Sequence, residues 1–252
     1  MVKKPAIMTI THLLLDIEGT TCPVSFVSDV LFPYARKSLP NFLIKHKEDS
    51  AVGEILKTAE REWNADSTPE SIKIRQVSKA QNFNSLDATR LYLEHLINID
   101  RKSTALKDLQ GKIWRDGYQR GEITSQLFHE TAESLKRWHN RNLSLSVYSS
   151  GSVQAQKLLY RHTKEGNLEY LFDNWFDTHT GNKKETDSYR RIAIEINAMS
   201  SNILFISDNP DECDAAQASG MLTLFSLRNG NPYQDPRNHR VIKSLNDVDE
   251  YI

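Results

Sequence analysis

The stretch that most constrains the fold runs from Leu13 to Thr21 and reads LLLDIEGTT, an apolar run that ends in a carboxylate and a turn. A short continuous apolar run is typical of a buried parallel strand, and ligands in α/β sheets bind at the carboxyl ends of such strands. Asp16 is therefore a candidate site residue. If the extended backbone persists, Asp16 and Glu18 share a face, where two carboxylates repel unless a cation lies between them. The alternative is an ordinary strand end followed by acidic turn residues.

The length and charge of the chain narrow the classes of function. At 252 residues it suits one large domain, or one domain that carries a smaller inserted one. A formal net charge of -1 and the lack of a basic, aromatic stripe argue against nucleic acid and anionic membranes as partners. We therefore expect a small-molecule partner.

The two cysteines, Cys22 and Cys213, lie far apart and form neither a zinc motif nor a disulfide framework. Residues 1–11 have no apolar stretch long enough for a signal peptide, and no later segment is as long as a membrane span. We expect a cytoplasmic protein, and a monomer, because no coiled coil or exposed apolar helix is evident.

The segment from Phe26 to about Arg120 is charged, helical in period and poor in strand signals. Pro33 and Pro40 are expected to limit the first helix, which includes the apolar positions from Val27 to Tyr34. Four further amphipathic helices are predicted over Ala51–Trp63, Glu70–Lys79, Leu86–Ile99 and Thr104–Tyr118.

Beyond Gly121 strands and helices alternate, as in a parallel sheet with helices on both faces. The predicted strands are Leu143–Tyr148, a short one near Trp175 and Phe176, Asn202–Ser207 and Met221–Ser226, and the predicted helices are His129–His139, Val153–Arg161, Glu185–Ile196 and Cys213–Ala218. This predicts a Rossmann-like α/β core, residues 1–21 plus 121–252, with an inserted all-helical cap, residues 22–120. No GxGxxG follows the first strand, which argues against a dinucleotide site.

Polar residues follow two of the later strands or precede a helix. Ser149 and Ser150 lie where a strand meets a helix, so hydroxyl and N–H groups there can hold a phosphate, or they can simply cap the helix. Lys183, after Gly181-Asn182, can neutralise phosphate oxygens. Lys184 is a competing candidate, and a loop lysine is often only solvated.

Asp208 ends another predicted strand, and Glu212 stands four residues later. Carboxylate oxygens are ligands that suit Mg²⁺, which usually takes one or two of them and keeps water or phosphate at its other positions. The alternative is that these carboxylates complement the N-terminus of a helix.

Together, these residues resemble the motifs of the haloacid dehalogenase superfamily of phosphohydrolases, in which an aspartate after the first strand is the nucleophile. The resemblance is more specific to the enolase-phosphatases (acireductone synthases) of methionine salvage, and it spans nearly the whole chain. Its motifs are residues 16–21 (DIEGTT), 26–27 with 31–34, 100–107 with 109–114, 148–152, 181–183 with 188–189, and 205–208. Asn209-Pro210 departs from the apolar pattern expected there, which leaves the role of Glu212 open, and residues 46–84 match nothing specific.

The resemblance implies that Asp16 attacks the phosphate of 2,3-diketo-5-methylthiopentyl-1-phosphate after the substrate has been enolised. It implies Mg²⁺ held by Asp16, Glu18 and Asp208, phosphate bound by Ser149, Ser150 and Lys183, and Glu18 in the place of the usual acid/base aspartate. A wall for the methylthio tail could come from the cap aromatics Phe26, Phe32, Tyr34 and Trp114, unless these residues belong to the core.

Two other functions are compatible with some of these residues. A Mg²⁺-dependent phosphatase for another small phosphate ester, without an enolase step, would have every core motif. A catalytically silent scaffold would be favoured by loss of Asp16 or Lys183, and both are present.

Overall fold

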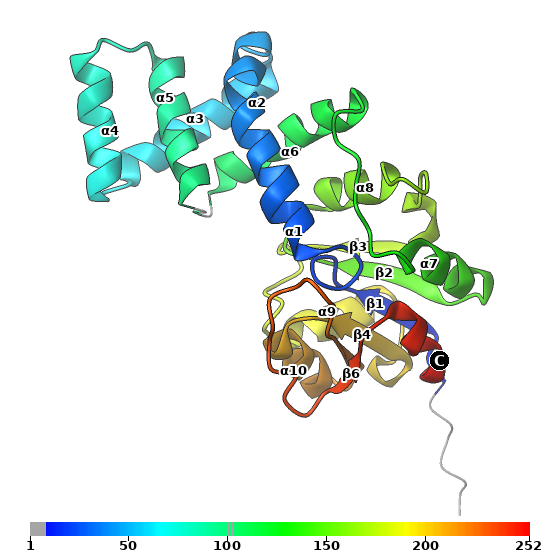
Figure 1. Cartoon of the computed structure of the whole chain (residues 1–252). Coiled ribbons are helices and arrows are strands. Elements are labelled where there is room, and N and C mark those ends of the chain that lie inside the picture. The colour runs from blue at the N-terminus through cyan, green and yellow to red at the C-terminus, as the bar shows by residue number, and fades with distance from the viewer. Residues whose placement is uncertain (1–8, 100, 102) are drawn as a thin grey trace, which may run out of the picture. The chain divides into compact units, whose positions relative to one another are not determined.

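The computed structural model describes residues 9–99, 101 and 103–252 (Figure 1). Asp100 and Lys102 of the motif named above lie outside the described residues, and so do residues 1–8, on which the expectation about a signal peptide partly rests. Contacts divide the chain into two compact units: the chain up to Val27 together with Thr124–Ile252, and Ser28–Ile123. The sequence predicted domain boundaries after residues 21 and 120, and the chain passes between the two units a few residues later, after Val27 and after Ile123.

The first unit is built on a parallel sheet of six strands in the order β3-β2-β1-β4-β5-β6. The central strand β1 pairs in parallel with β2 on one side and β4 on the other. The strands are β1 (His12–Leu15), β2 (Ser144–Tyr148), β3 (Asn174–Phe176), β4 (Ile203–Ser207), β5 (Leu222–Ser226) and β6 (Arg240–Ile242). This topology confirms the predicted α/β fold class.

Helices cover both faces of this sheet (Figure 1). They are α7 (Thr131–Asn140), α8 (Val153–Arg161), α9 (Thr186–Glu195) and α10 (Pro210–Ala218), with the short α1 (Val24–Phe26) and 3-10 turns at Glu169–Leu171, Ser200–Asn202 and Leu245–Glu250. From β1 the chain adds β2 and β3 toward one edge of the sheet, and from β4 it adds β5 and β6 toward the other edge. The direction in which strands are added therefore reverses between the neighbours β1 and β4. Ligand sites of open α/β sheets lie at the carboxyl side of such a reversal.

The strand β6 was not predicted. It has three residues, of which Arg240 and Val241 are exposed, so the sequence contains no apolar run that would predict a strand there. The helix α10 begins at Pro210 rather than at Cys213. Its start is explained by Asn209, whose side chain accepts hydrogen bonds from the N–H groups of Asp211 and Glu212, and by proline at the first helical position.

The second unit is helical, as predicted, with its own buried core. Its helices are α2 (Phe32–Lys45), α3 (Ser50–Ala65), α4 (Pro69–Ala80), α5 (Ser85–Asn98) and α6 (Thr104–Gln119), and a π-helical turn, Val27–Leu31, precedes α2. The expectation that Pro40 limits the first helix is wrong, because α2 continues through it. Leu39, Phe42 and Leu43 around it are buried in the core of the unit, and this packing outweighs the lost backbone hydrogen bond.

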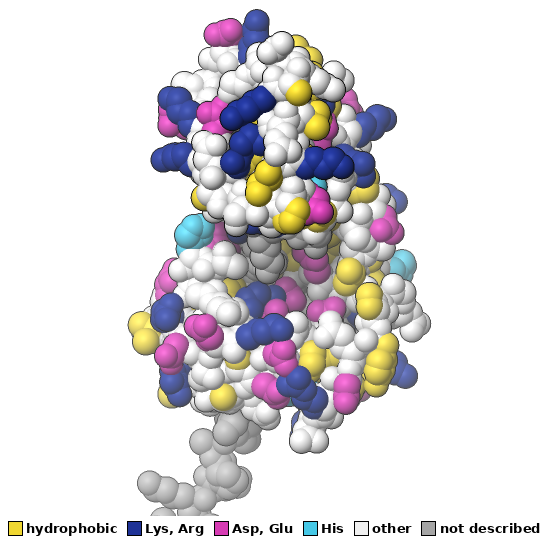
Figure 2. All heavy atoms as spheres, turned by 90° about the vertical axis from the view of Figure 1, so that its left-hand side faces the viewer, with side chains coloured by type: hydrophobic (Ala, Val, Ile, Leu, Met, Phe, Trp, Pro, Cys, Tyr) yellow, Lys and Arg dark blue, Asp and Glu magenta, His cyan; other side chains and the backbone are white. Residues whose placement is uncertain are grey.

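The surface carries charges of both signs. On the face shown in Figure 2, Lys and Arg side chains lie among Asp and Glu side chains, in keeping with the formal net charge of -1. Within the described part of the chain, no helix combines the length and the apolar character needed to cross a bilayer.

Two isoleucines of α9 provide a matched test of the packing between this helix and the sheet. Ile192 is 0% exposed and Ile194 is 79% exposed, so replacement by alanine leaves a cavity only at Ile192. We expect Ile192→Ala to lower the free energy of unfolding by about 2 to 5 kcal/mol, and Ile194→Ala to change it by less than about 0.5 kcal/mol. Urea unfolding followed by circular dichroism measures both, and equal losses would contradict the packing described here.

Candidate active site

Asp16 lies directly after the central strand, with its carboxylate 5% exposed. Its backbone N–H donates to the carbonyl of Ile206 at 3.0 Å, and its Oδ1 accepts from the N–H of Ile17 at 2.8 Å. The strand ends at Leu15 and the backbone bends at Ile17. The extended backbone therefore does not persist to Glu18, and the condition under which Asp16 and Glu18 would share a face is not met.

Lys183 reaches Asp16 from the loop between β3 and α9. Its Nζ donates to Asp16 Oδ1 at 2.6 Å and lies 2.7 Å from Glu212 Oε2, and the side chain is nearly buried. The Nζ of Lys183 also lies 5.8 Å from the centroid of the Tyr148 ring. The backbone carbonyl of Lys183 accepts from the hydroxyl of Tyr189 at 2.7 Å. Lys184, the competing candidate, instead pairs with Asp211 at the surface.

Ser207 connects the two carboxylates that face Lys183. Its Oγ lies 2.9 Å from Glu212 Oε2 and 3.2 Å from Asp16 Oδ2, and it accepts from the N–H of Asn209 at 3.1 Å. A hydroxyl has one proton, so Ser207 donates to only one of these carboxylates at a time. Ser207 was not predicted as a site residue although it lies in the 205–208 motif, because its contact with Asp16 depends on the register of β1 with β4, in which Leu15 pairs with Ile206.

Glu212, whose role the sequence left open, belongs to this cluster. The cap made by Asn209 and Pro210 starts α10 so that Glu212 lies in its first turn, buried beside Lys183 and Ser207. The polar, stiff pair that departs from the family pattern therefore has a structural explanation as a helix start.

Asp208 packs against the turn that follows Asp16. Gly19 has φ +75°, and a Cβ on it would lie 1.9 Å from Asp208 Oδ2. No side chain fits there, which explains the glycine at this position. Glu18, the residue before it, is half-buried, and its backbone forms a bridge with Cys22.

Residues from three other segments hold the turn that carries Glu18. The carbonyl of Gly19 accepts from Ser226 Oγ at 3.0 Å and from Asn231 Nδ2 at 3.1 Å, and Asn231 Oδ1 accepts from the N–H of Val24 at 3.3 Å. Thr21 Oγ1 and Tyr160 Oη form a buried hydrogen bond of 2.7 Å. None of these partners was predicted, because each comes from a distant part of the sequence.

Ser149 and Ser150 follow β2, next to the central strand. Ser149 is 4% exposed, its N–H donates to the carbonyl of Phe176 at 3.2 Å, and its Oγ accepts from the N–H of Gly151 at 3.4 Å. Ser150 is exposed. The cap of α8 is Ser152, whose Oγ accepts from the N–H of Ala155, so capping does not explain the two serines before it.

The charges of this cluster do not balance. Burial raises the pKa of Asp208 to about 7, and the nearby charges of Asp16 and Glu212 act in the same direction. Burial and the charge of Asp16 also raise the pKa of Glu212, against the effect of Lys183. Burial alone would lower the pKa of Lys183, but Asp16 and Glu212 raise it, so the ammonium stays charged. One buried cation therefore faces several carboxylates.

For the aromatic residues considered as a substrate wall, the alternative was a place in the core. Phe26 is fully buried, in line with that alternative. Tyr34 and Trp114 pack against the core of the helical unit, and Trp114 Nε1 donates to the carbonyl of Leu31 at 2.8 Å. Phe32 lies beside Trp114, 6.2 Å between ring centroids.

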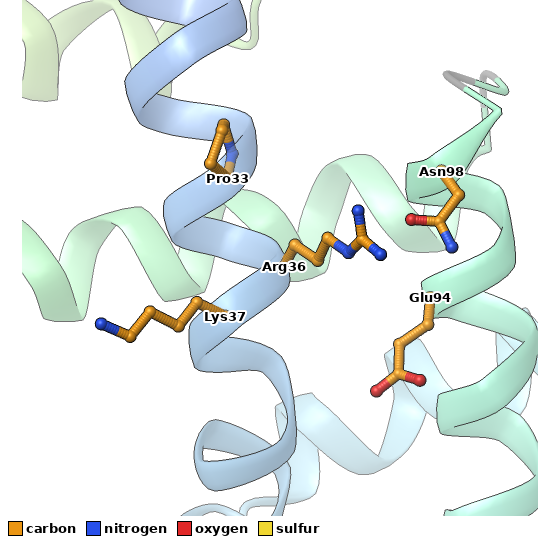
Figure 3. Close-up of a pocket in the computed structure, with 5 residues that line it drawn as sticks. All are labelled: Pro33, Arg36, Lys37, Glu94 and Asn98. Atoms are coloured by element: carbon orange, nitrogen blue, oxygen red, sulfur yellow. The ribbon is translucent and has the colours of Figure 1, made fainter.

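A separate hollow lies between α2 and α5 of the helical unit (Figure 3). It is lined by Pro33, Arg36, Lys37, Glu94 and Asn98, and none of the predicted site residues takes part in it. Arg36 extends toward the helix that carries Asn98 and Glu94. Its charged, exposed lining does not resemble the buried cluster around Asp16.

Known proteins resemble this chain over nearly its whole length. Residues 10–220 match the haloacid dehalogenase-like hydrolase family. Enolase-phosphatase E1 of Parasynechococcus marenigrum (strain WH8102) is 70% identical over 97% of this chain and 100% of its own length. Enolase-phosphatase E1 of Synechococcus sp. (strain CC9902) is 52% identical over 96% of this chain and 99% of its own length.

A solved structure supports the same relationship. The UTR4 protein of Saccharomyces cerevisiae superposes with a TM-score of 0.73 at 34% identity, over 93% of this chain and 98% of that one. The family expected from the sequence motifs is thereby confirmed. The chain belongs to the haloacid dehalogenase-like hydrolases and, within them, to the enolase-phosphatases.

Proposed function

We propose that this enolase-phosphatase converts 2,3-diketo-5-methylthiopentyl-1-phosphate to the acireductone and phosphate, by enolisation followed by dephosphorylation through an aspartyl-phosphate. The observation that carries the proposal is the buried carboxylate of Asp16 at the end of the central strand, with the ammonium of Lys183 at 2.6 Å. The relatives named Enolase-phosphatase E1 support the choice of reaction.

The contacts of Asp16 indicate which of its oxygens attacks phosphorus. Oδ1 already accepts from the N–H of Ile17 and from Lys183, whereas the one hydrogen bond to Oδ2 from the described part of the chain is the longer contact with Ser207. When Ser207 donates its proton to Glu212, Oδ2 keeps its lone pairs for attack. Oδ2 then forms the bond to phosphorus while the bond to the ester oxygen breaks, and water later releases inorganic phosphate.

The remaining site residues stabilise charge and move protons. Lys183 neutralises oxygens of the phosphate, whose negative charge would otherwise repel the attacking carboxylate. Ser149 and Ser150 donate to the same group. Glu18 is the proposed proton-transfer group, which takes the carbon-bound proton in enolisation and supplies one to the leaving oxygen afterwards.

The carboxylates of the site fit a magnesium ion. Among the described residues, no three His, Cys, Asp or Glu side chains are already gathered around an ion position. Mg²⁺ usually needs only one or two protein carboxylates, which Asp16 and Asp208 offer, with Glu18 beside them. The pKa of Asp208 is raised first by burial and then by the charges of Asp16 and Glu212, and a cation at this position would offset these charges. When bound, Mg²⁺ would supply charge neutralisation for the phosphate and polarise a substrate oxygen.

Replacing the nucleophile separates the two reactions. We expect Asp16→Asn to lower the rate of phosphate release by at least about 10³-fold, because the asparagine amide cannot form the aspartyl-phosphate intermediate. Enol absorbance and phosphate are followed together on the diketo substrate, with and without Mg²⁺, and the exposed Asp235→Asn is the matched control.

The outcomes of that experiment distinguish the candidate functions. Enol formation ahead of phosphate release, with phosphate release lost in Asp16→Asn, supports the proposal. Turnover of generic esters but not of the diketo compound would leave a phosphatase without an enolase step. No turnover of either compound by the wild type would contradict both.

Glu18 is tested by an isosteric change. We expect Glu18→Gln to slow enolisation by about 10²-fold or more, since the amide cannot accept the carbon-bound proton at neutral pH. Enol absorbance after mixing measures this rate, and the exposed Glu165→Gln is the control. An unchanged rate in Glu18→Gln would assign proton transfer to another group.

The charge imbalance predicts how stability depends on pH without metal. Because the folded-state pKa of Asp208 is raised to about 7, its protonated form stabilises the fold at low pH, and this contribution is lost as the pH rises. Relative to wild type, we expect Asp208→Asn to gain about 2 to 3 kcal/mol in free energy of unfolding between pH 5 and pH 8. Urea unfolding in EDTA measures the difference, and addition of Mg²⁺ should reduce it. A pH-independent difference would refute this account of Asp208.

A further inference from the structure

Gln156 of α8 is a buried polar residue with no role in the reaction described above. Its side chain is 1% exposed, and its Nε2 donates to the carbonyls of Gly151 and Phe176, each at 2.8 Å, with the carbonyl of Ser149 at 3.5 Å. A primary amide has two N–H groups, so the two short bonds use both protons.

The orientation of this amide follows from its surroundings. If oxygen and nitrogen were exchanged, Oε1 would face three carbonyl oxygens and repel them. In the orientation observed, Oε1 is buried and has no hydrogen-bond partner among the described residues. The amide thus donates both of its protons to backbone carbonyls, while its own oxygen is left without a hydrogen bond from the described residues.

Of the two carbonyls that Gln156 binds, that of Gly151 belongs to the loop with the predicted phosphate-binding serines, and that of Phe176 ends β3. A carbonyl oxygen repels an anion, whereas N–H and O–H groups attract it. Gln156 binds the carbonyl of Gly151, so the helix holds this repulsive group in place. Ser149 Oγ accepts from the N–H of Gly151, so its own proton remains to be donated.

A second contact fixes the far end of the same loop. Asp177, directly after β3, accepts from the N–H of Val153 at 3.2 Å through Oδ2 and from the N–H of His179 at 2.9 Å through Oδ1. Phe176, which precedes it, also accepts from the N–H of Ser149 at 3.2 Å. The loop from 149 to 152 is therefore bound to the end of β3 on both sides.

We infer that Gln156 is a positioning residue for phosphate binding, which holds the carbonyl of Gly151 away from the phosphate and ties the loop to the end of β3 through the carbonyl of Phe176, so that the loop presents its donors. This inference rests on the proposed function, because it takes Ser149 and Ser150 as the groups that bind phosphate. Gln156 itself contacts neither substrate nor reacting atoms.

The test compares two glutamines of one helix. Gln156→Glu keeps the shape of the side chain but turns a carboxylate toward the three carbonyls, whereas Gln154→Glu makes the same change at an exposed position. For Gln156→Glu we expect KM for the phosphate ester and Ki for inorganic phosphate to rise by about tenfold, the effect of losing one hydrogen bond, with kcat lowered less than threefold. Gln154→Glu should leave all three constants unchanged.

A second variant guards against a general loss of structure. Gln156→Met removes the donor without adding charge, and circular dichroism and thermal melting establish whether each variant is folded. Folded variants with raised KM and Ki and nearly constant kcat support the inference. Unchanged KM and Ki, a loss confined to kcat, or failure of both variants to fold would overturn it.

Inorganic phosphate binding measured by calorimetry separates this inference from the proposed function. A wild type that binds phosphate more tightly than Gln156→Met but does not turn over the diketo substrate would refute the reaction and leave the loop argument standing. Equal phosphate affinity, or no affinity in the wild type, would refute the role of Gln156.

Discussion

The ammonium of Lys183 is the interaction on which the site depends. It is buried between Asp16 and Glu212, at 2.6 and 2.7 Å. A buried charge is tolerated only when it is paired and hydrogen-bonded, so the end of β1, the loop after β3 and the first turn of α10 must meet at this point. The same ammonium that joins these segments also faces the carboxylate proposed to attack phosphate, and structure and chemistry therefore share one group.

The turn and loop around this ion pair are held by backbone hydrogen bonds from distant side chains. Asn231 and Ser226 bind the carbonyl of Gly19, and Gln156 binds the carbonyl of Gly151 in the loop after β2. Each contact gives a hydrogen-bond partner to a backbone carbonyl of the turn or loop. Gly19 itself allows the turn to approach Asp208, because no Cβ fits between them.

Much of the fold could be predicted from local patterns. Apolar runs identified five of the six strands of the sheet, β1 to β5, and amphipathic periodicity identified the helical block. The failures have physical causes. The edge strand at Arg240–Ile242 lacks an apolar run, and α2 continues through Pro40 because its flanking side chains are buried. Both depend on what packs against the segment, which local sequence does not contain.

The sequence by itself indicated Asp16 and Asp208 as site candidates, because a polar residue that ends an apolar strand marks the carboxyl edge of a parallel sheet, but it left open the choice between Lys183 and Lys184 and the role of Glu212. The tertiary structure decided which of them touch. Ser207 lies beside Asp16 only through the register of β1 with β4, and Glu212 joins Lys183 only because a helix starts at Asn209-Pro210. The position of a strand end can be predicted from neighbouring residues in the sequence, whereas contacts between residues far apart in the chain are set by strand pairing and packing.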